Sequence, residues 1–290
     1  MEQTHEVGDD LPDALVPLAL PGPADWARLG MRVRHELSGG YQSRVFSAEA
    51  DRSVIAKLTD ERLVDPVQFE RRLDALVGLA RQNDEAVGPQ RREGAFVNRL
   101  RGWLVVVYPL VGGRPPDLDR QSDVVQMGRS LAGLHRSMAQ LPTTGLPAAA
   151  ALQVTAAWAP DLPSDRTQLI HGDFGAANLL LHAGGLRVFD FDDCGSGPVE
   201  FDVGNALYMV LFDTTVNRNP GRYERFRDWF VDSYRTTAEE TVDDGVLDTV
   251  IDLRRSALRH WLDNLSEAPI GIRTSSGEWR RTLRSFAGPT

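Results

Sequence analysis

Stretches of alternating apolar and polar positions, together with short apolar runs, mark five segments in the first third of the chain and predict β-strands. The segments lie at residues 31–37, 44–50, 53–59, 95–100 and 103–110. Gly39 and Gly40 form a turn between the first two, and apolar residues recur at helical spacing from Pro66 to Arg81. We therefore expect a five-stranded antiparallel sheet with one helix, preceded by a Pro-rich, acidic lead-in over residues 1–30.

The rest of the chain has a mainly helical pattern. A Gly/Pro-rich segment at 111–117 separates the two parts, so we place a domain boundary there, with an N-terminal lobe at 1–111 and a C-terminal lobe at 112–290. Helices are expected at 119–140, 149–158, 199–214, 221–237 and 243–265, and short strands within 167–181 and at 186–191. The fold class predicted from this order is α+β.

The charge balance excludes some functions. The chain has 41 acidic and 32 basic residues, a net charge of −9, whereas a nucleic-acid surface needs clustered positive charge. Residues 161–202 contain eight acids and two bases, a local charge of −6, which calls for a metal ion or a cationic ligand. With one cysteine, no long apolar run and no signal-peptide pattern, we expect a cytoplasmic protein.

The densest candidate chemistry lies in the segment His171-Gly172-Asp173-Phe174-Gly175-Ala176-Ala177-Asn178. Asp173 and Asn178 stand five residues apart in a loop, and Asp190 follows at the end of a predicted strand. Phosphoryl transfer needs a carboxylate to orient the acceptor hydroxyl and oxygen ligands to hold Mg²⁺ against the nucleotide phosphates. These three residues supply that set.

Lys57 is the only lysine among the 32 basic residues. A GC-rich coding sequence explains the arginine bias, but a guanidinium does not replace lysine where a compact point charge is required. Lys57 ends the run Val54-Ile55-Ala56-Lys57 on the third predicted strand, where a kinase-like fold has its phosphate-binding lysine. Glu70 on the next helix is its expected ion-pair partner, with Asp74 as the fallback.

These residues resemble the aminoglycoside phosphotransferase and choline-kinase-like family, which has the protein-kinase fold. The resemblance covers about residues 31–210. It rests on VIAK, on LAGLH (131–135), on HGDFGAAN and on VFDFDDCGSGPVEFDVGNAL (188–207).

The resemblance implies a bilobal enzyme that binds ATP or GTP between its lobes. Asp173 would be the catalytic base, Asn178 and Asp190 would bind Mg²⁺, and Asp202 would buttress the catalytic loop that His171 helps to fix. The hinge that contacts the nucleotide base would run from Tyr108 through Leu110 to Val111, and the Gly39-Gly40 hairpin would cover the phosphates.

The chain also departs from the protein-kinase pattern. It lacks a full G-x-G-x-x-G, and Gly172 stands where protein kinases have an arginine that answers an activation-loop phosphate. No A-P-E follows. These differences imply a small-molecule acceptor and no phosphorylation switch.

The acidic site favours a cationic acceptor. An antibiotic of an actinobacterial-type resistance enzyme fits, either an aminoglycoside or a basic cyclic peptide such as capreomycin or viomycin. A metabolic acceptor (homoserine, choline or a sugar) and a protein Ser/Thr acceptor remain open, since 141–168 and the C-terminal helices could each form the acceptor wall.

Two other classes fit the sequence less well. A haloacid-dehalogenase-like phosphatase would use Asp190 as a nucleophile, but Cys194 stands where that family has a small hydroxyl residue and the lysine lies upstream. A pseudokinase would lack a catalytic residue, and every such position is filled. His135 is expected to be a packed core histidine and Cys194 an inert thiol.

Overall fold

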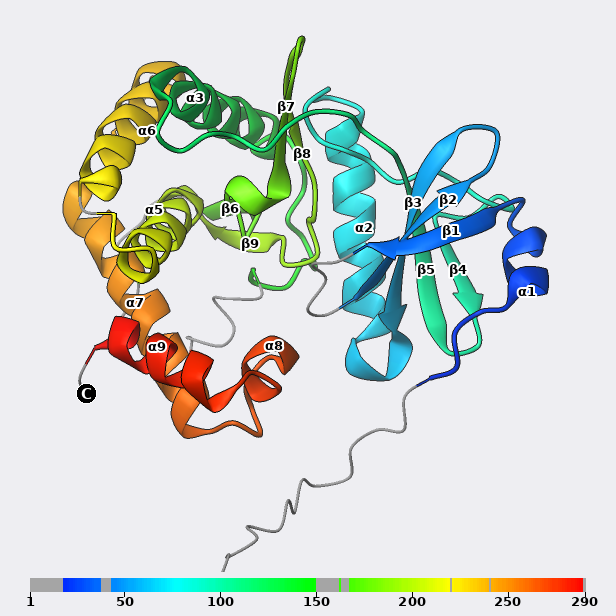
Figure 1. Cartoon of the computed structure of the whole chain (residues 1–290). Helices are drawn as coiled ribbons and strands as arrows, with labels where there is room; N and C mark the ends of the chain where they lie inside the picture. The colour runs from blue at the N-terminus through cyan, green and yellow to red at the C-terminus, as the bar shows by residue number, and fades with distance from the viewer. Residues whose placement is uncertain are drawn as a thin grey trace, which may run out of the picture.

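The computed structural model describes residues 18–37, 43–149, 162, 167–219, 221–239 and 241–288. Gly39, Gly40 and all but the first residue of the helix expected at 149–158 lie outside these residues. The described chain forms a sheet on one side and a helical part on the other, with helix α2 (Pro66–Ala80) between them (Figure 1).

The sheet is antiparallel and has five strands, as the alternation predicted. Its spatial order is β1-β2-β3-β5-β4. The strands are β1 (Arg32–Leu37), β2 (Arg44–Glu49), β3 (Ser53–Asp60), β4 (Val97–Leu100) and β5 (Trp103–Pro109). Lys57 lies on the central strand β3, opposite Val45 of β2 and Val106 of β5.

The two faces of β3 have different surroundings because side chains alternate along a strand. Val54, Ala56 and Leu58 are fully buried in a core shared with Trp26 of helix α1 (Pro23–Arg28). Lys57 therefore points to the opposite face, where α2 packs. The helix begins where the sequence predicts, because Asp65 accepts hydrogen bonds from the first turn and proline occupies the first helical position.

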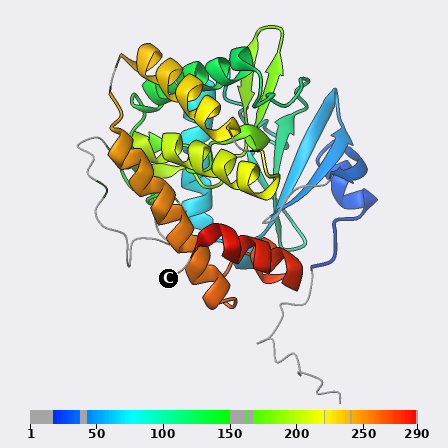
Figure 2. The same ribbon diagram turned by 60° about the vertical axis from the view of Figure 1, so that its left-hand side comes forward.

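The C-terminal part is built around one buried helix. The long helices are α3 (Gln121–Met138), α5 (Val199–Val216), α6 (Arg222–Ala238) and α7 (Asp244–Asp263), followed by α8 (Ile270–Arg273) and α9 (Gly277–Ala287). Helix α5 packs against α6, α7 and α9, and Figure 2 shows it inside the helical layer. Its apolar side chains surround the axis, which is typical of a fully buried helix.

Two small antiparallel sheets carry the loops between the two parts. They pair β6 (Thr167–Ile170) with β9 (Gly195–Pro198), and β7 (Leu179–His182) with β8 (Gly185–Val188), and the 3₁₀ helix η2 (Ala176–Asn178) precedes β7. The sequence did not predict β9, since Gly-Ser-Gly-Pro has no alternating pattern. The strand expected at 186–191 is shorter, because Asp190 has a φ of 66° and cannot continue it.

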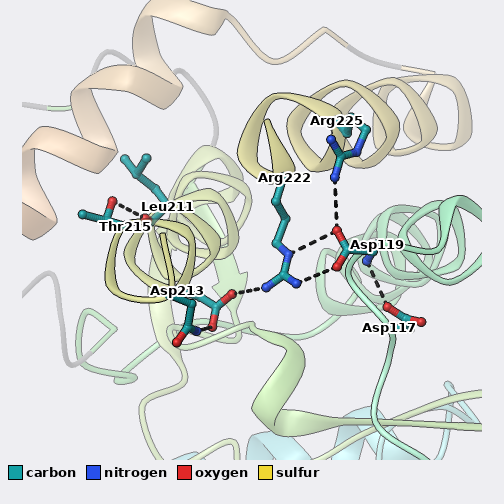
Figure 3. A network of polar contacts seen from close by, with 8 residues as sticks. Asp117, Asp119, Leu211, Asp213, Thr215, Arg222 and Arg225 are labelled. Carbon is teal, nitrogen blue, oxygen red and sulfur yellow. Dashed lines mark hydrogen bonds and ion pairs between the residues drawn. The ribbon is translucent and has the colours of Figure 1, made fainter. Parts of the chain in front are cut away.

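An ion-pair network fixes the entry to α3 against two later helices (Figure 3). Asp119 accepts hydrogen bonds from Arg222 at 2.5 Å and Arg225 at 3.2 Å, and Arg222 also reaches Asp213 of α5 at 2.6 Å. The boundary proposed at 111/112 falls in the segment between β5 and α3 and stays a prediction. In the described part of the chain, no helix is both long and apolar enough to span a membrane.

Candidate active site

The backbone of the His171–Asp173 loop is held by one buried carboxylate. Asp202 is fully buried at the start of α5 and accepts hydrogen bonds from the N–H of His171 at 2.7 Å and of Gly172 at 2.8 Å. Hydrogen bonds that N–H groups donate to an ionised carboxylate are stronger than those between neutral groups. The loop therefore has a fixed position relative to α5, which is the geometry expected of a buttressing residue.

His135 connects this carboxylate to the helical core. Its Nε2 lies 3.0 Å from Asp202 Oδ2, and its Nδ1 lies 2.8 Å from the hydroxyl of Tyr234 on α6. The predicted burial of His135 is confirmed. Sequence reasoning missed its link to Asp202, because 67 residues separate the two.

Gly172 is required by a close backbone contact. Its φ is +82°, and a Cβ atom at this position would lie 2.3 Å from the carbonyl oxygen of Asp193. A larger side chain, such as the arginine of protein kinases, cannot occupy this position without moving the loop. The contact also places the Asp193 backbone directly against the His171–Asp173 loop.

His171 is fully buried and its tautomer follows from its partners. Its Nδ1 accepts from the Asp173 N–H at 3.2 Å, so its Nε2 carries the proton and donates to the Phe189 carbonyl at 3.2 Å. Its ring also packs on Phe191 at a centroid distance of 4.4 Å. His171 thus connects the loop to the segment that carries Asp190.

Asp173 is oriented by two asparagine side chains. The Nδ2 of Asn178 donates to the Asp173 carbonyl at 2.9 Å and to its Oδ2 at 3.2 Å. The Nδ2 of Asn205 donates to Asp173 Oδ1 at 3.4 Å and to the Phe174 carbonyl at 3.2 Å. Asn205 is a site residue that sequence reasoning missed, although its position three residues after Asp202 puts both on one face of α5.

Lys57 meets two carboxylates at the other end of the site. Its Nζ lies 2.6 Å from Asp190 Oδ1 and 2.7 Å from Asp192 Oδ2, and its side chain is 14% exposed. Burial opposes the charged form of Lys57, but Asp192 and Asp190 outweigh burial and raise the pKa of its ammonium above the ordinary value. The left-handed backbone of Asp190 is a strained conformation of the kind that gathers at functional sites.

The expected ion pair between Lys57 and Glu70 is not formed. Glu70 lies 3.1 Å from Arg99 of β4, because α2 turns Phe69, Leu73 and neighbouring residues toward the site instead. Those residues line a pocket beside the lysine, made by Phe69, Arg72, Leu73, Leu76, Tyr108, Phe191 and Asp192. Asp74, the fallback partner, does not pair with Lys57 either. The two described partners of Lys57 are Asp190 and Asp192.

Arg72 ties α2 to the site in place of the predicted glutamate. Its Nε donates to the Cys194 carbonyl at 2.9 Å, four residues after Asp190. Burial raises the pKa of the Cys194 thiol to about 12. This thiol stays protonated at neutral pH, as expected of an inert cysteine.

The predicted hinge residues lie at the end of β5. Tyr108 pairs with Ile55 of β3, lines the pocket beside Lys57, and has a phenol whose pKa is raised by burial. Leu110 donates its N–H to the Ser53 carbonyl at 3.3 Å, and the residue is 51% exposed. The other predicted nucleotide-binding residues, Gly39 and Gly40, lie outside the described residues.

Burial also acts on the acids of the loop. It raises the pKa of Asp173, while Arg254 of α7 opposes the change. Burial, followed by the neighbouring charges of Asp173 and Asp192, raises the pKa of Asp193 to about 7. The site thus contains carboxylates whose negative charge is poorly compensated by the protein itself.

The described oxygen ligands of the site fit a magnesium ion that is bound partly by phosphates and water, and they do not form a site that could hold a metal ion by itself. No described group of three or more His, Cys, Asp or Glu side chains is arranged to hold a metal ion. Asn178 uses its Nδ2 for Asp173, which leaves its Oδ1 as a ligand, and its carbonyl accepts from the N–H of Phe189, next to Asp190. An amide oxygen and a carboxylate, completed by phosphates and water, are the ligands that Mg²⁺ usually takes beside nucleotides.

Comparison with known proteins finds a family that is similar to this part of the chain. Residues 139–239, which contain Asp173, Asn178, Asp190 and Asp202, match the profile of the phosphotransferase enzyme family, APH. The segment that contains the candidate catalytic residues is thus similar to this family. The sequence-based resemblance to aminoglycoside phosphotransferases and the expectation of a phosphotransferase are confirmed.

Relatives of this phosphotransferase span most of its length. Stress response kinase A of Salmonella paratyphi A is 24% identical, covering 90% of this chain and 89% of that protein. The structure of amicoumacin kinase hAmiN in complex with AMP-PNP, Ca²⁺ and Ami has a TM-score of 0.67 at 19% identity and covers 93% and 89% of the two chains. The microcompartment-associated aminopropanol kinase gives 0.66 at 22% identity, with 89% of each chain covered. The bilobal kinase-like fold is therefore confirmed.

Proposed function

We propose that this phosphotransferase moves the γ-phosphate of ATP to a hydroxyl of a small, amine-bearing molecule. One relationship carries the proposal. Asn178 donates to Asp173 while Lys57 pairs with Asp190, so the base, the oxygen ligands and the phosphate-binding cation belong to one connected site.

Each residue of the site has its own role in the transfer of the phosphoryl group. Asp173 orients the acceptor hydroxyl and accepts its proton as the oxygen bonds to the γ-phosphorus and the bond to ADP breaks. Lys57 neutralises the phosphates that are not transferred. Asn178 and Asp190 would hold Mg²⁺, which would neutralise charge on the phosphates. Most of the rate gain comes from positioning and charge, because the transition state is loose.

The carboxylate of Asp193 favours an amine on the acceptor. Asp193 makes no hydrogen bond or ion pair with its side chain in the part of the chain described, and it lies beside the catalytic loop. A cationic antibiotic, phosphorylated to confer resistance, fits this charge. A metabolic amino alcohol fits it equally, and the similarity to an aminopropanol kinase favours that second candidate.

An ADP-release assay across a panel of acceptors tests the proposal. The panel holds aminoglycosides, capreomycin, viomycin, 3-amino-1-propanol, choline, homoserine, a hexose and a protein substrate, each with ATP or GTP and with or without Mg²⁺. We expect ADP release with a cationic small molecule and none with the Asp173→Ala variant, which should still bind nucleotide. Release of phosphate from a phosphoester without nucleotide would contradict the proposal.

A further inference from the structure

Arg254 lies on helix α7, which the catalytic motifs do not include. Helices α5 and α7 are in close contact at Gly204, where a Cβ atom would lie 2.6 Å from Val250. Four residues further along each helix, the guanidinium carbon of Arg254 lies 5.2 Å from the ring centroid of Tyr208. The tyrosine ring thus supports the guanidinium near the face of α5 that carries Asn205.

The guanidinium of Arg254 has no counter-ion within the part of the chain that the structure describes. Among the residues that the structure describes, it makes no hydrogen bond or ion pair, and its buried Nε has no acceptor. The neighbouring Arg255 also packs its guanidinium on an aromatic ring, 5.1 Å from the centroid of Phe286, and also has a buried Nε without an acceptor. Unlike Arg254, it lies 4.0 Å from a carboxylate, that of Asp252. A partly buried cation without a partner is costly, so the difference between the two arginines needs an explanation.

The positive charge of Arg254 acts on the catalytic carboxylate. It opposes the effect of burial on the pKa of Asp173 and on that of Asp193, yet it pairs with neither. Asp193 is likewise unpaired, and its backbone packs on Gly172. One unpaired acid and one unpaired base therefore lie within electrostatic reach of the residue that orients the acceptor hydroxyl.

We propose that Arg254 binds a carboxylate of the acceptor and that Asp193 binds its ammonium, so that the acceptor is a hydroxylated amino acid or a close analogue. The inference rests on the proposed function and narrows its substrate class. A guanidinium binds carboxylate through two parallel hydrogen bonds, which gives orientation as well as affinity. Choline and simple sugars carry no carboxylate, and amino alcohols leave Arg254 without a partner.

Four compounds separate the contribution of the acceptor's carboxylate from that of its ammonium. L-homoserine carries the hydroxyl, the ammonium and the carboxylate; 3-amino-1-propanol lacks the carboxylate, 4-hydroxybutyrate lacks the ammonium, and 1-propanol lacks both. L-serine and ethanolamine form a shorter matched pair. We expect the wild type to prefer the amino acid of a pair over its amino alcohol by about 10-fold or more in kcat/KM, as a charge-assisted hydrogen bond gives.

Variants of the two neighbouring arginines make the test specific. Arg254→Met should reduce kcat/KM for the amino acid by about 10-fold more than for the matching amino alcohol, and Arg254→Lys should restore part of the preference. Arg255→Met is the control and should leave the preference as it is. An equal loss with every compound in Arg254→Met, or a preference that survives it, would overturn the inference.

Failure of this inference is distinguishable from failure of the proposed function. ADP release with amines that is indifferent to a carboxylate overturns the role of Arg254 and leaves the phosphotransferase proposal standing. If none of the four compounds is phosphorylated, calorimetric titration of L-homoserine into the protein with a non-hydrolysable ATP analogue decides. Binding that is weakened by Arg254→Met but not by Arg255→Met supports the inference, and absence of binding overturns it.

Discussion

The Nζ of Lys57 lies 2.6 Å from Oδ1 of Asp190, although 133 residues separate them in the sequence. The only lysine of the chain is thus joined to the candidate metal ligand. A compact ammonium contacts two carboxylates at once, at 2.6 and 2.7 Å, whereas a planar guanidinium is longer and needs a different geometry.

Lys57→Arg should therefore keep the charge and lose the activity. We expect kcat/KM for ATP to fall roughly 100-fold, the usual effect of misplacing a group by about 1 Å. The control is Arg99→Lys, which exchanges the same two residue types at the exposed pair with Glu70 and should cost little. Normal turnover by Lys57→Arg would refute the phosphate-binding role.

Asn178→Ala should weaken the affinity of the site for Mg²⁺. It removes the amide oxygen assigned to Mg²⁺, so the concentration of Mg²⁺ needed for half-maximal activity should rise about 10-fold or more. The measurement is a Mg²⁺ titration of ADP release at saturating ATP. Asn217→Ala, at an exposed asparagine that ends α5, should match the wild type, and an unchanged titration for Asn178→Ala would exclude the ligand role.

Asn205→Ala should slow transfer more than it weakens nucleotide binding. The Asn205 amide holds Asp173 Oδ1 at 3.4 Å, a long bond, so kcat should fall by about 3- to 10-fold with little change in the KM for ATP. Asn205→Asp puts a second carboxylate beside the first and should raise the pKa of Asp173. The acid limb of the pH profile of kcat should then move to higher pH, which a purely structural defect would not produce.

Asp202→Asn should destabilise the whole C-terminal part. Both carboxylate oxygens accept hydrogen bonds, from Gly172 on one side and from His171 and His135 on the other, and an amide can accept on one side alone. We expect a loss of about 2–4 kcal/mol in the free energy of unfolding, measured by urea titration. The exposed Asp252→Asn is the control and should stay within about 0.5 kcal/mol of the wild type.

Asp193→Asn should change how stability depends on pH. The folded-state pKa of Asp193 is raised to about 7 from an ordinary value of 3.8, so its contribution to stability is complete below the ordinary value and is lost as pH rises through 7. Asp193→Asn should thus melt a few degrees above the wild type at pH 8 and at the same temperature near pH 4. Scans in EDTA without nucleotide, with Asp232→Asn as the exposed control, test this; equal melting at both pH values would contradict it.

Local patterns predicted the elements well where a single periodicity dominates. The alternation of β3 and the helical spacing of α2 gave both elements to within a residue, since burial of one face is enough to define them. The strand β9 was missed because its Gly-Ser-Gly-Pro sequence carries no pattern; it becomes a strand by pairing with β6. The end of β8 was misplaced because Asp190 leaves the extended conformation there.

Some features of the candidate site could likewise be predicted from the sequence, and others could not. The spacing of Asp173, Asn178 and Asp190 and the position of Lys57 could be taken from the sequence, because loop and strand ends set them locally. The partner of Glu70 could not. The packing of α2 decides which of its side chains face the site, and a rotation of one residue position moves a side chain by about 100°.

The sequence by itself determined the fold class, the phosphotransfer motif and the lone lysine in the strand where that motif needs one. The tertiary structure alone decided that Lys57 meets Asp190 and Asp192, and that Asp202 and His135 hold the His171–Asp173 loop. It also decided that Arg254 acts on Asp173 without an ion-pair partner among the described residues. The physical reason is that motifs are short-range and follow from neighbouring residues. Ion pairs between distant segments depend instead on how whole helices pack, which no local pattern contains.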